Sequence, residues 1–219
     1  MIIFATNYDE ATKGGFVVAQ LISVRTVPVG TEWLLGDAAT RESLKERLES
    51  LPKTPLLAFS HGEDTHICGQ DGVPAIQLAD GTVIGSRPVF AYACWTGDIL
   101  GKSVAQNGAI WWGFTGRIAA LPSDTKCARI FSKFFAKVIS DLTTLNTGPK
   151  VDQYLRYVAL LCDSARSDLE LLRLTGHHVD PHGYYCIEHI LTRLRVWMPG
   201  ANLPIYKATG GTPVSIAGL

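Results

Sequence analysis

Short apolar runs alternate with amphipathic stretches along the first half of the chain. The apolar, β-prone runs predict five strands, at residues 2–6, 31–37, 54–60, 87–94 and 109–114. Amphipathic stretches predict helices within residues 7–23, at 39–51 with Thr40 as the N-cap, and at 98–108. Nearly continuous apolar strands joined by helices are typical of a mostly parallel sheet covered on both faces. The pattern therefore predicts an α/β fold.

Two further patterns extend this prediction. Asp80-Gly81 stands between apolar flanks, so residues 74–84 are predicted to form a β-hairpin. Beyond about residue 122 the pattern predicts helices only, at 123–141, 150–174 and 182–197. We expect residues 1–145 to form the α/β domain and residues 146–219 to form a helical C-terminal extension packed on the same unit.

The long helix predicted at 150–174 carries an apolar seam. Its members alternate steps of four and three residues: Val151, Leu155, Val158, Cys162, Ala165, Leu169 and Leu172. We expect the seam to pack against the next helix through Ile187, Leu191 and Leu194, closing an antiparallel pair against the sheet. The alternative is a face that docks a regulatory protein partner.

Composition and charge narrow the class of protein. The chain has 219 residues, 47% of them hydrophobic, which suffices for one sizeable core. Twenty Lys and Arg residues balance twenty Asp and Glu residues, so the overall charge favours neither nucleic acid nor an anionic membrane as a partner. The absence of a secretory leader and of a long apolar span predicts a soluble, cytoplasmic protein. Five scattered cysteines without CxxC spacing fit reduced thiols.

The ends of two predicted strands carry residues able to catalyse acyl transfer. The strand at 54–60 runs into His61-Gly62, and the strand at 87–94 ends at Cys94. Ligands of open parallel sheets bind beyond the carboxyl ends of the strands, so these residues are expected to meet there. An imidazole beside a thiol lowers the pKa of the cysteine toward neutrality. The backbone N–H groups of Gly62 and Cys94 could then hold the oxyanion of a tetrahedral intermediate.

The segments LLAFSHG, VFAYACWTGD and GAIWWGFTGRI, in this order, resemble the caspase-like (clan CD) cysteine peptidases, most closely their bacterial CHAT-domain branch. The resemblance covers roughly residues 1–145. It implies a caspase-like fold in which His61 is the general base and acid, Cys94 is the nucleophile, and Gly62 and Cys94 form the oxyanion site. It also implies cleavage of a partner protein in bacterial, including antiviral, defence or regulated cell death. Tyr92 departs from the family, which has Gln or Asp two residues before the nucleophile.

The substrate pocket is predicted from the loops beside these residues. Asp9, Glu63 and Asp64 could converge near the scissile bond together with Tyr92, and their carboxylates favour cleavage after a basic residue. Asp9 is the best single candidate for the pocket acid, although it could also cap the first helix. Arg117 argues for the opposite preference.

A metal or cofactor is not predicted. The imidazoles and thiol of His177, His178, His182, Cys186 and His189 are of ligand type but lack a standard ligand spacing. The glycine-rich segments GQDG and ADGTVIG lack the lysine of a phosphate-binding loop. The sequence therefore predicts a cysteine endopeptidase that acts on a protein or peptide without a cofactor. Two alternatives remain open: a catalytically silent binding module of the same fold, and a thiol-dependent amidase or acyltransferase that acts on a small molecule.

Overall fold

The computed structural model describes residues 1–24, 29–142 and 144–206. Its centre is a six-stranded sheet that includes all five predicted strands. In spatial order the strands are β2 (Glu32–Leu35), β1 (Ile2–Ala5), β3 (Leu56–Phe59), β7 (Pro88–Tyr92), β8 (Ile110–Phe114) and β9 (Leu194–Trp197). The first five run parallel to their neighbours, and only β9 is antiparallel to β8.

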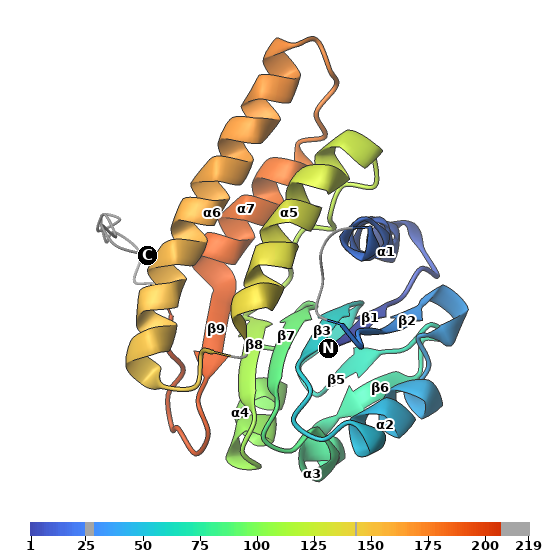
Figure 1. Cartoon of the computed structure of the whole chain (residues 1–219), viewed down its shortest axis with the longest axis vertical. Coiled ribbons are helices and arrows are strands. Elements are labelled where there is room, and N and C mark those ends of the chain that lie inside the picture. Colours follow the sequence, from blue (N-terminus) through green and yellow to red (C-terminus); the bar gives the residue numbers. More distant parts are fainter. Residues whose placement is uncertain (25–28, 143, 207–219) are drawn as a thin grey trace.

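Helices cover both faces of the sheet, which confirms the predicted α/β fold (Figure 1). One face carries α1 (Glu10–Ser23), α5 (Thr125–Leu142), α6 (Gly148–Leu174) and α7 (His182–Arg193). The other carries α2 (Arg41–Ser50), α3 (Gly81–Ile84) and α4 (Ile99–Gln106). Thr40 caps α2 as predicted, because its hydroxyl accepts a hydrogen bond from the N–H of Ser43. Within the described ranges, no helix is both long enough and apolar enough to cross a bilayer.

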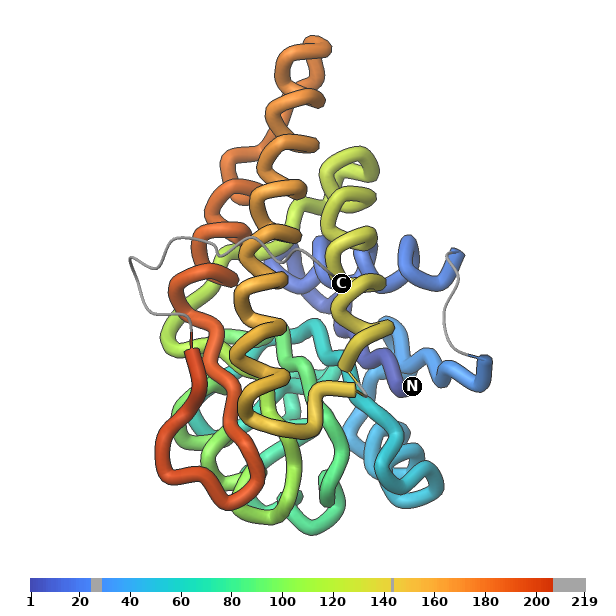
Figure 2. The backbone as a smooth tube through the Cα atoms, turned by 60° about the vertical axis from the view of Figure 1, so that its left-hand side comes forward, coloured from blue at the N-terminus to red at the C-terminus, as the bar shows by residue number. Residues whose placement is uncertain are grey.

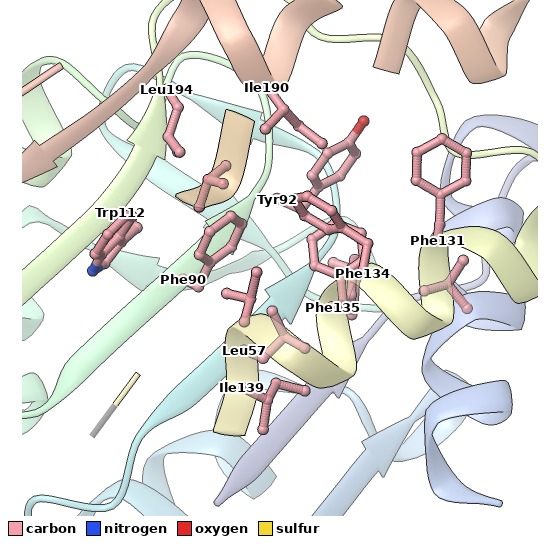
Figure 3. Packing of buried hydrophobic residues seen from close by; sticks show 14 of the residues in the cluster. Leu57, Phe90, Tyr92, Trp112, Phe131, Phe134, Phe135, Ile139, Ile190 and Leu194 are labelled. Atoms are coloured by element: carbon pink, nitrogen blue, oxygen red, sulfur yellow. The ribbon is translucent and has the colours of Figure 1, made fainter. Parts of the chain in front are cut away.

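The sheet separates two apolar cores. Successive side chains of a strand point to opposite faces, so Trp111 and Trp112 are both fully buried but belong to different cores. The larger core is rich in aromatic rings, and Phe90, Tyr92 and Phe135 meet there at the base of α5 (Figure 3). Edge-to-face packing of this kind fixes the position of β7, the strand that leads to Cys94.

The helices α5, α6 and α7 rise together from the sheet (Figure 2). Leu155, Val158 and Leu169 of the predicted seam are 5%, 2% and 0% exposed, so the seam is buried within the monomer as expected. Leu155 and Val158 face Ile190 and Leu191 across a narrow gap between α6 and α7. The expected packing of the seam on the next helix is confirmed, except that Leu194 belongs to β9 and not to the helix.

The predicted end of the last helix was wrong. The helix ends at Arg193, and Leu194–Trp197 form β9 instead of a final helical turn. The expectation that only helices follow residue 122 fails at the same place. The cause is tertiary: β8 would otherwise leave an open edge, and pairing of Phe114 with Leu194 through Trp111 with Trp197 closes it.

The hairpin predicted at 74–84 was also wrong. Pro74–Gln77 form β6, and the following residues turn into a 3₁₀ helix at Leu78–Asp80 and then into α3. Asp80 does not sit in a hairpin turn, because Arg41 of α2 binds both of its carboxylate oxygens at 2.9 Å. The partners of β6 lie elsewhere: β4 (Gly62–Glu63), β5 (His66–Cys68) and β6 form a small antiparallel sheet after His61.

Candidate active site

His61 and Cys94 follow two neighbouring parallel strands. Phe59 at the end of β3 pairs with Tyr92 at the end of β7. His61 and Cys94 each follow two residues later, so they lie at the same edge of the sheet. Both line one cavity of about 350 Å³. The structure therefore brings together the two residues that strand-end reasoning placed side by side.

His61 is held by the loop that follows β1. Its Nε2 lies 2.7 Å from Oδ2 of Asp9, and the ring of Tyr8 packs against the imidazole with centroids 5.4 Å apart. This hydrogen bond assigns the proton of a neutral imidazole to Nε2, because the carboxylate can only accept. Nδ1 is then the basic nitrogen.

Asp9 has two structural partners. Its Oδ1 accepts a hydrogen bond from the N–H of Thr12 at 2.9 Å, within a capping box that starts α1. Burial tends to raise the pKa of Asp9, but the hydrogen bonds from His61 and Thr12 outweigh it and leave that pKa below its usual value. Asp9 is therefore a carboxylate fixed by the helix start, and it is not among the residues that line the cavity. The predicted pocket acid instead faces His61.

The thiol of Cys94 is bonded to the opposite wall of the cavity. Its Sγ accepts a hydrogen bond from the N–H of Ile118 at 3.3 Å, and no hydrogen bond within the described residues joins it to His61. Burial raises the pKa of Cys94, against the lowering effects of the Ile118 N–H and the Arg117 charge. The pKa of Cys94 is therefore raised instead of lowered toward neutrality as expected, because desolvation dominates at the thiol.

The loop after Cys94 is rigidly tied to the sheet. Trp95 has φ of 61°, a left-handed conformation that costs a non-glycine residue of order 1–3 kcal/mol. Its N–H donates to the carbonyl of Gly116, which follows β8. The indole N–H groups of Trp111 and Trp197 donate to the carbonyls of Thr96 and Gly97 at 2.8 and 2.6 Å. These bonds hold the strained turn that presents Cys94.

Two features of the Gly62 backbone bear on its predicted oxyanion role. His61 and Cys68 form a hydrogen-bonded pair, so the alternation of an antiparallel ladder turns the N–H of Gly62 away from β5. A side chain is also excluded here, because a Cβ at this position would lie 2.5 Å from the carbonyl oxygen of Cys94. The two predicted oxyanion residues are therefore in direct backbone contact.

The segment at residues 117–121 forms the far wall of the cavity. Its backbone is anchored by the hydroxyl of Tyr92, which donates to the carbonyl of Ala119 at 2.9 Å, and by Nδ1 of His189, which accepts from the N–H of Ala119 at 2.8 Å. The thiol of Cys186 donates to the carbonyl of Ala120 at 3.2 Å. We call residues 117–121 the wall segment.

Of the other residues predicted for the pocket, three line the cavity and Asp64 does not. Glu63 and Arg117 both line the cavity and are both exposed at its rim. Asp64 is exposed and lies outside the lining, where its carbonyl accepts from the N–H of Leu100. Tyr92 lines the cavity but is 5% exposed, and burial raises its pKa well above the usual value. Tyr92 therefore supports the wall segment as a neutral phenol.

The histidine- and cysteine-rich segment contributes to this wall. His189 and Cys186 support it, whereas His182 pairs with Asp180 and His177 contacts Lys126. Among the described residues, no three His, Cys, Asp or Glu side chains are grouped to hold a metal ion.

Sequence reasoning missed three contributors to the site. The roles of Tyr8, Ile118 and His189 depend on contacts between segments far apart in the chain. Only Tyr8 could have been found from the order of the strands, because β1 and β3 are neighbours and the loops that follow them must meet.

Comparison with known proteins finds no family model that matches the chain and no significant match among curated proteins.

Proposed function

We propose that this protein is a cysteine endopeptidase in which Cys94 is the nucleophile and His61 is the general base and acid. One observation carries the proposal: a thiol and an imidazole line the same cavity at the ends of adjacent parallel strands, with a carboxylate bonded to Nε2 of the imidazole. A nucleophile, a base and a third group that orients the base form the recurring arrangement of covalent acyl transfer.

The chemistry follows from the protonation states. The raised pKa of Cys94 means that the resting thiol keeps its proton, so the proton leaves during attack on the substrate. Nδ1 of His61 accepts it while Sγ bonds to the peptide carbonyl carbon. Collapse of the tetrahedral intermediate breaks the C–N bond, and His61 returns the proton to the leaving amine. Water, deprotonated by His61, then hydrolyses the thioester and restores the thiol.

The remaining groups serve this sequence of steps. The N–H groups of Gly62 and Cys94 stabilise the oxyanion, which is worth about 10²–10³-fold in kcat per donor in other enzymes. Asp9 stabilises the imidazolium that forms when His61 accepts the proton. The five thiols of the chain form no disulfide, which fits action in a reducing cytoplasm.

The decisive experiment measures peptide cleavage by variants. Cys94→Ala and His61→Ala are each expected to abolish cleavage of a broad fluorogenic peptide library, with the loss at His61 about 10²–10⁴-fold or more. Cys68→Ser is the matched control, since Cys68 is a half-buried thiol next to the site that has no catalytic role here. Circular dichroism melts verify that each variant is folded. Cleavage that survives in Cys94→Ala contradicts the proposal, as does a wild-type chain that cleaves no peptide.

A second candidate is a catalytically silent binding module with the same cavity. The bond from the Ile118 N–H to Cys94 and the raised pKa of the thiol favour it, because both describe a thiol at rest. If the protein is a silent module, wild type and Cys94→Ala would bind peptide equally well, and neither protein would cleave it.

The third candidate, an amidase or acyltransferase acting on a small molecule, is favoured by the modest cavity of about 350 Å³. Screening small amides and acyl donors alongside peptides separates it.

The cellular role rests on the resemblance to bacterial CHAT peptidases. We propose that the protein cleaves a partner protein in defence or regulated cell death. Mass spectrometric comparison of new protein N-termini in cells expressing wild type or Cys94→Ala tests this proposal. A cleavage that depends on Cys94 supports it, and identical N-termini in the two samples contradict it.

A further inference from the structure

The buried part of the cavity beside Cys94 is lined by apolar side chains, Phe59 and Leu121 among them. Beyond the nucleophile it runs between the start of α1 and the wall segment, and its lining includes Ala11, Gly15, Phe59, Tyr92, Ala120 and Leu121. Phe59 and Leu121 are 1% and 4% exposed, so these side chains are fixed parts of the core that form the inner surface. A volume of about 350 Å³ holds one side chain with its adjoining peptide group more readily than several residues.

Three hydroxyl groups that line the cavity are already bonded to the protein. The hydroxyl of Thr12 is within hydrogen-bond distance of Asp9, and that of Ser60 donates to the carbonyl of Cys68 at 2.7 Å. The hydroxyl of Tyr92 donates to the carbonyl of Ala119 at 2.9 Å. These groups therefore have little capacity left to bind a charged side chain.

Charged groups stand only at the cavity rim. Glu63 and Arg117 are exposed, carry opposite charges, and leave no net charge between them. The carboxylate of Asp9 is bonded to His61 and Thr12 and lies outside the lining. A lysine, arginine or aspartate side chain in the interior would lose its hydration without gaining an ionic partner.

We infer that the cavity beside Cys94 selects an uncharged, apolar side chain at the substrate residue that precedes the cut. The inference rests on the proposed peptidase function, and it replaces the basic preference expected from the acidic loops. Apolar burial favours such a side chain, whereas unpaired charge disfavours the others.

The test is a matched peptide series on the full chain. Peptides of the form acetyl-Ala-Ala-X-aminomethylcoumarin differ only at X, which is Ala, Val, Leu, Phe, Lys, Arg or Asp. We expect kcat/KM for the best apolar peptide to exceed that for Lys, Arg and Asp by at least tenfold, with all cleavage lost in Cys94→Ala. Cleavage that depends on Cys94 but prefers a charged X overturns the inference and leaves the peptidase function standing.

A second measurement ranks the side chains at X even when turnover is too slow to follow. Peptide aldehydes with the same X residues form a reversible hemithioacetal with a reactive thiol, so their inhibition or binding constants rank X without turnover. Tightest binding for apolar X supports the inference. Failure of every aldehyde and every coumarin peptide contradicts the proposed function itself, and the inference with it.

A pocket variant tests the assignment independently. Ala11 lines the cavity on α1 and is itself exposed, so a longer side chain can be accommodated there. Ala11→Glu is expected to raise kcat/KM for the Lys and Arg peptides at least tenfold relative to the Leu peptide. Ala11→Gln has the same shape without the charge and is expected to leave that ratio unchanged. An unaltered ratio in Ala11→Glu would show that the substrate side chain does not enter this cavity.

Discussion

Asp9 joins the start of α1 to the imidazole of His61. One carboxylate oxygen accepts the capping hydrogen bond from Thr12, and the other lies 2.7 Å from Nε2 of His61. The lowered pKa of Asp9 means that this link adds stability above the ordinary pKa of an aspartate. The contribution is lost as pH falls through the folded-state pKa. The imidazole is therefore held by an ionised partner throughout the neutral range.

Replacing Asp9 tests this link. Asp9→Asn keeps the size and the capping acceptor but removes the charge that stabilises the imidazolium. We expect kcat to fall roughly 10- to 100-fold with little change in KM, less than the ~10²–10⁴-fold effect of losing the general base. Glu10→Gln is the control, since it neutralises the next carboxylate, which pairs with Lys13. Equal activity of Asp9→Asn and wild type across the pH profile would contradict the assignment.

The pKa of Cys94 makes a separate prediction about pH. Because burial raises it, the thiolate fraction at pH 7.5 is smaller than that of an unfolded cysteine. Iodoacetamide should therefore alkylate Cys94 more slowly in the folded protein than in urea, with a rate that keeps rising into alkaline pH. Peptide mapping by mass spectrometry follows the rate at each thiol. Faster alkylation in the folded protein would instead show a resting thiolate paired with His61.

At the residue scale, the sequence predicted that His61 and Cys94 lie together, but not what each of them contacts. His61 and Cys94 could be found because apolar runs end on them, and parallel strands place such residues at one edge. The partner of His61 could not be assigned, because a carboxylate in a loop looks the same whether it caps a helix, binds substrate or orients an imidazole. The raised pKa of Cys94 depends on burial in the folded protein, which no local pattern reveals.

The wall segment is the element that shapes the cavity. It connects β8 to α5 without regular secondary structure, and α1 approaches it at Gly14. A Cβ at Gly14 would lie 1.6 Å from the carbonyl oxygen of Leu121, so only glycine allows this contact. The position of the Ile118 N–H that binds Cys94 therefore depends on α1 as well as on the sheet.

Gly14→Ala tests the role of this contact. The methyl group must displace the wall segment, so we expect a loss of about 1–3 kcal/mol in the free energy of unfolding and a clear loss of peptidase activity. Gly148→Ala is the matched control in a helix, because its Cβ would meet only Ile205 at 3.8 Å. Denaturant unfolding measures both. A Gly14→Ala protein as stable and as active as wild type would contradict the described packing.

The errors at the element scale share one physical cause. The apolar spacing of residues 182–197 fits a helix throughout, yet the last four residues pair with the edge of β8. The Asp80-Gly81 pair fits a hairpin turn, yet Arg41 of α2 draws Asp80 into the start of α3. In both segments a distant partner outweighs a local propensity of order 1 kcal/mol.

At the scale of the whole molecule, the site lies where the chain order of the sheet reverses. From β1 the chain builds β2 on one side, and then β3 and β7 on the other. Ligands of open α/β sheets bind at such a point because the following loops diverge and leave a crevice. Asp9, His61 and Cys94 follow β1, β3 and β7, so the topology brings the three loops to one edge of the sheet, where His61 and Cys94 line the cavity.

The C-terminal segment completes this molecule. It supplies the edge strand β9, and Val158, Ile187 and Leu194 belong to the same core as Phe90 and Trp112. Figure 3 shows Leu194 near Phe90 and Trp112. A chain cut after residue 145 would expose that core and the edge of β8, so we expect it to lack a cooperative thermal transition by circular dichroism. A cooperative melt close to that of the full chain would show that residues 1–145 fold alone.

Covalent trapping at Cys94 tests the central claim most directly. A peptide acyloxymethyl ketone with leucine at the reactive position alkylates a thiol only after binding as a substrate does, and mass spectrometry of the intact and digested protein locates the adduct. The account predicts one adduct, on Cys94, that disappears in urea and falls steeply in His61→Ala, while Cys68, Cys127, Cys162 and Cys186 stay unmodified. An unmodified Cys94, or labelling that is the same in the folded and unfolded protein, would contradict it.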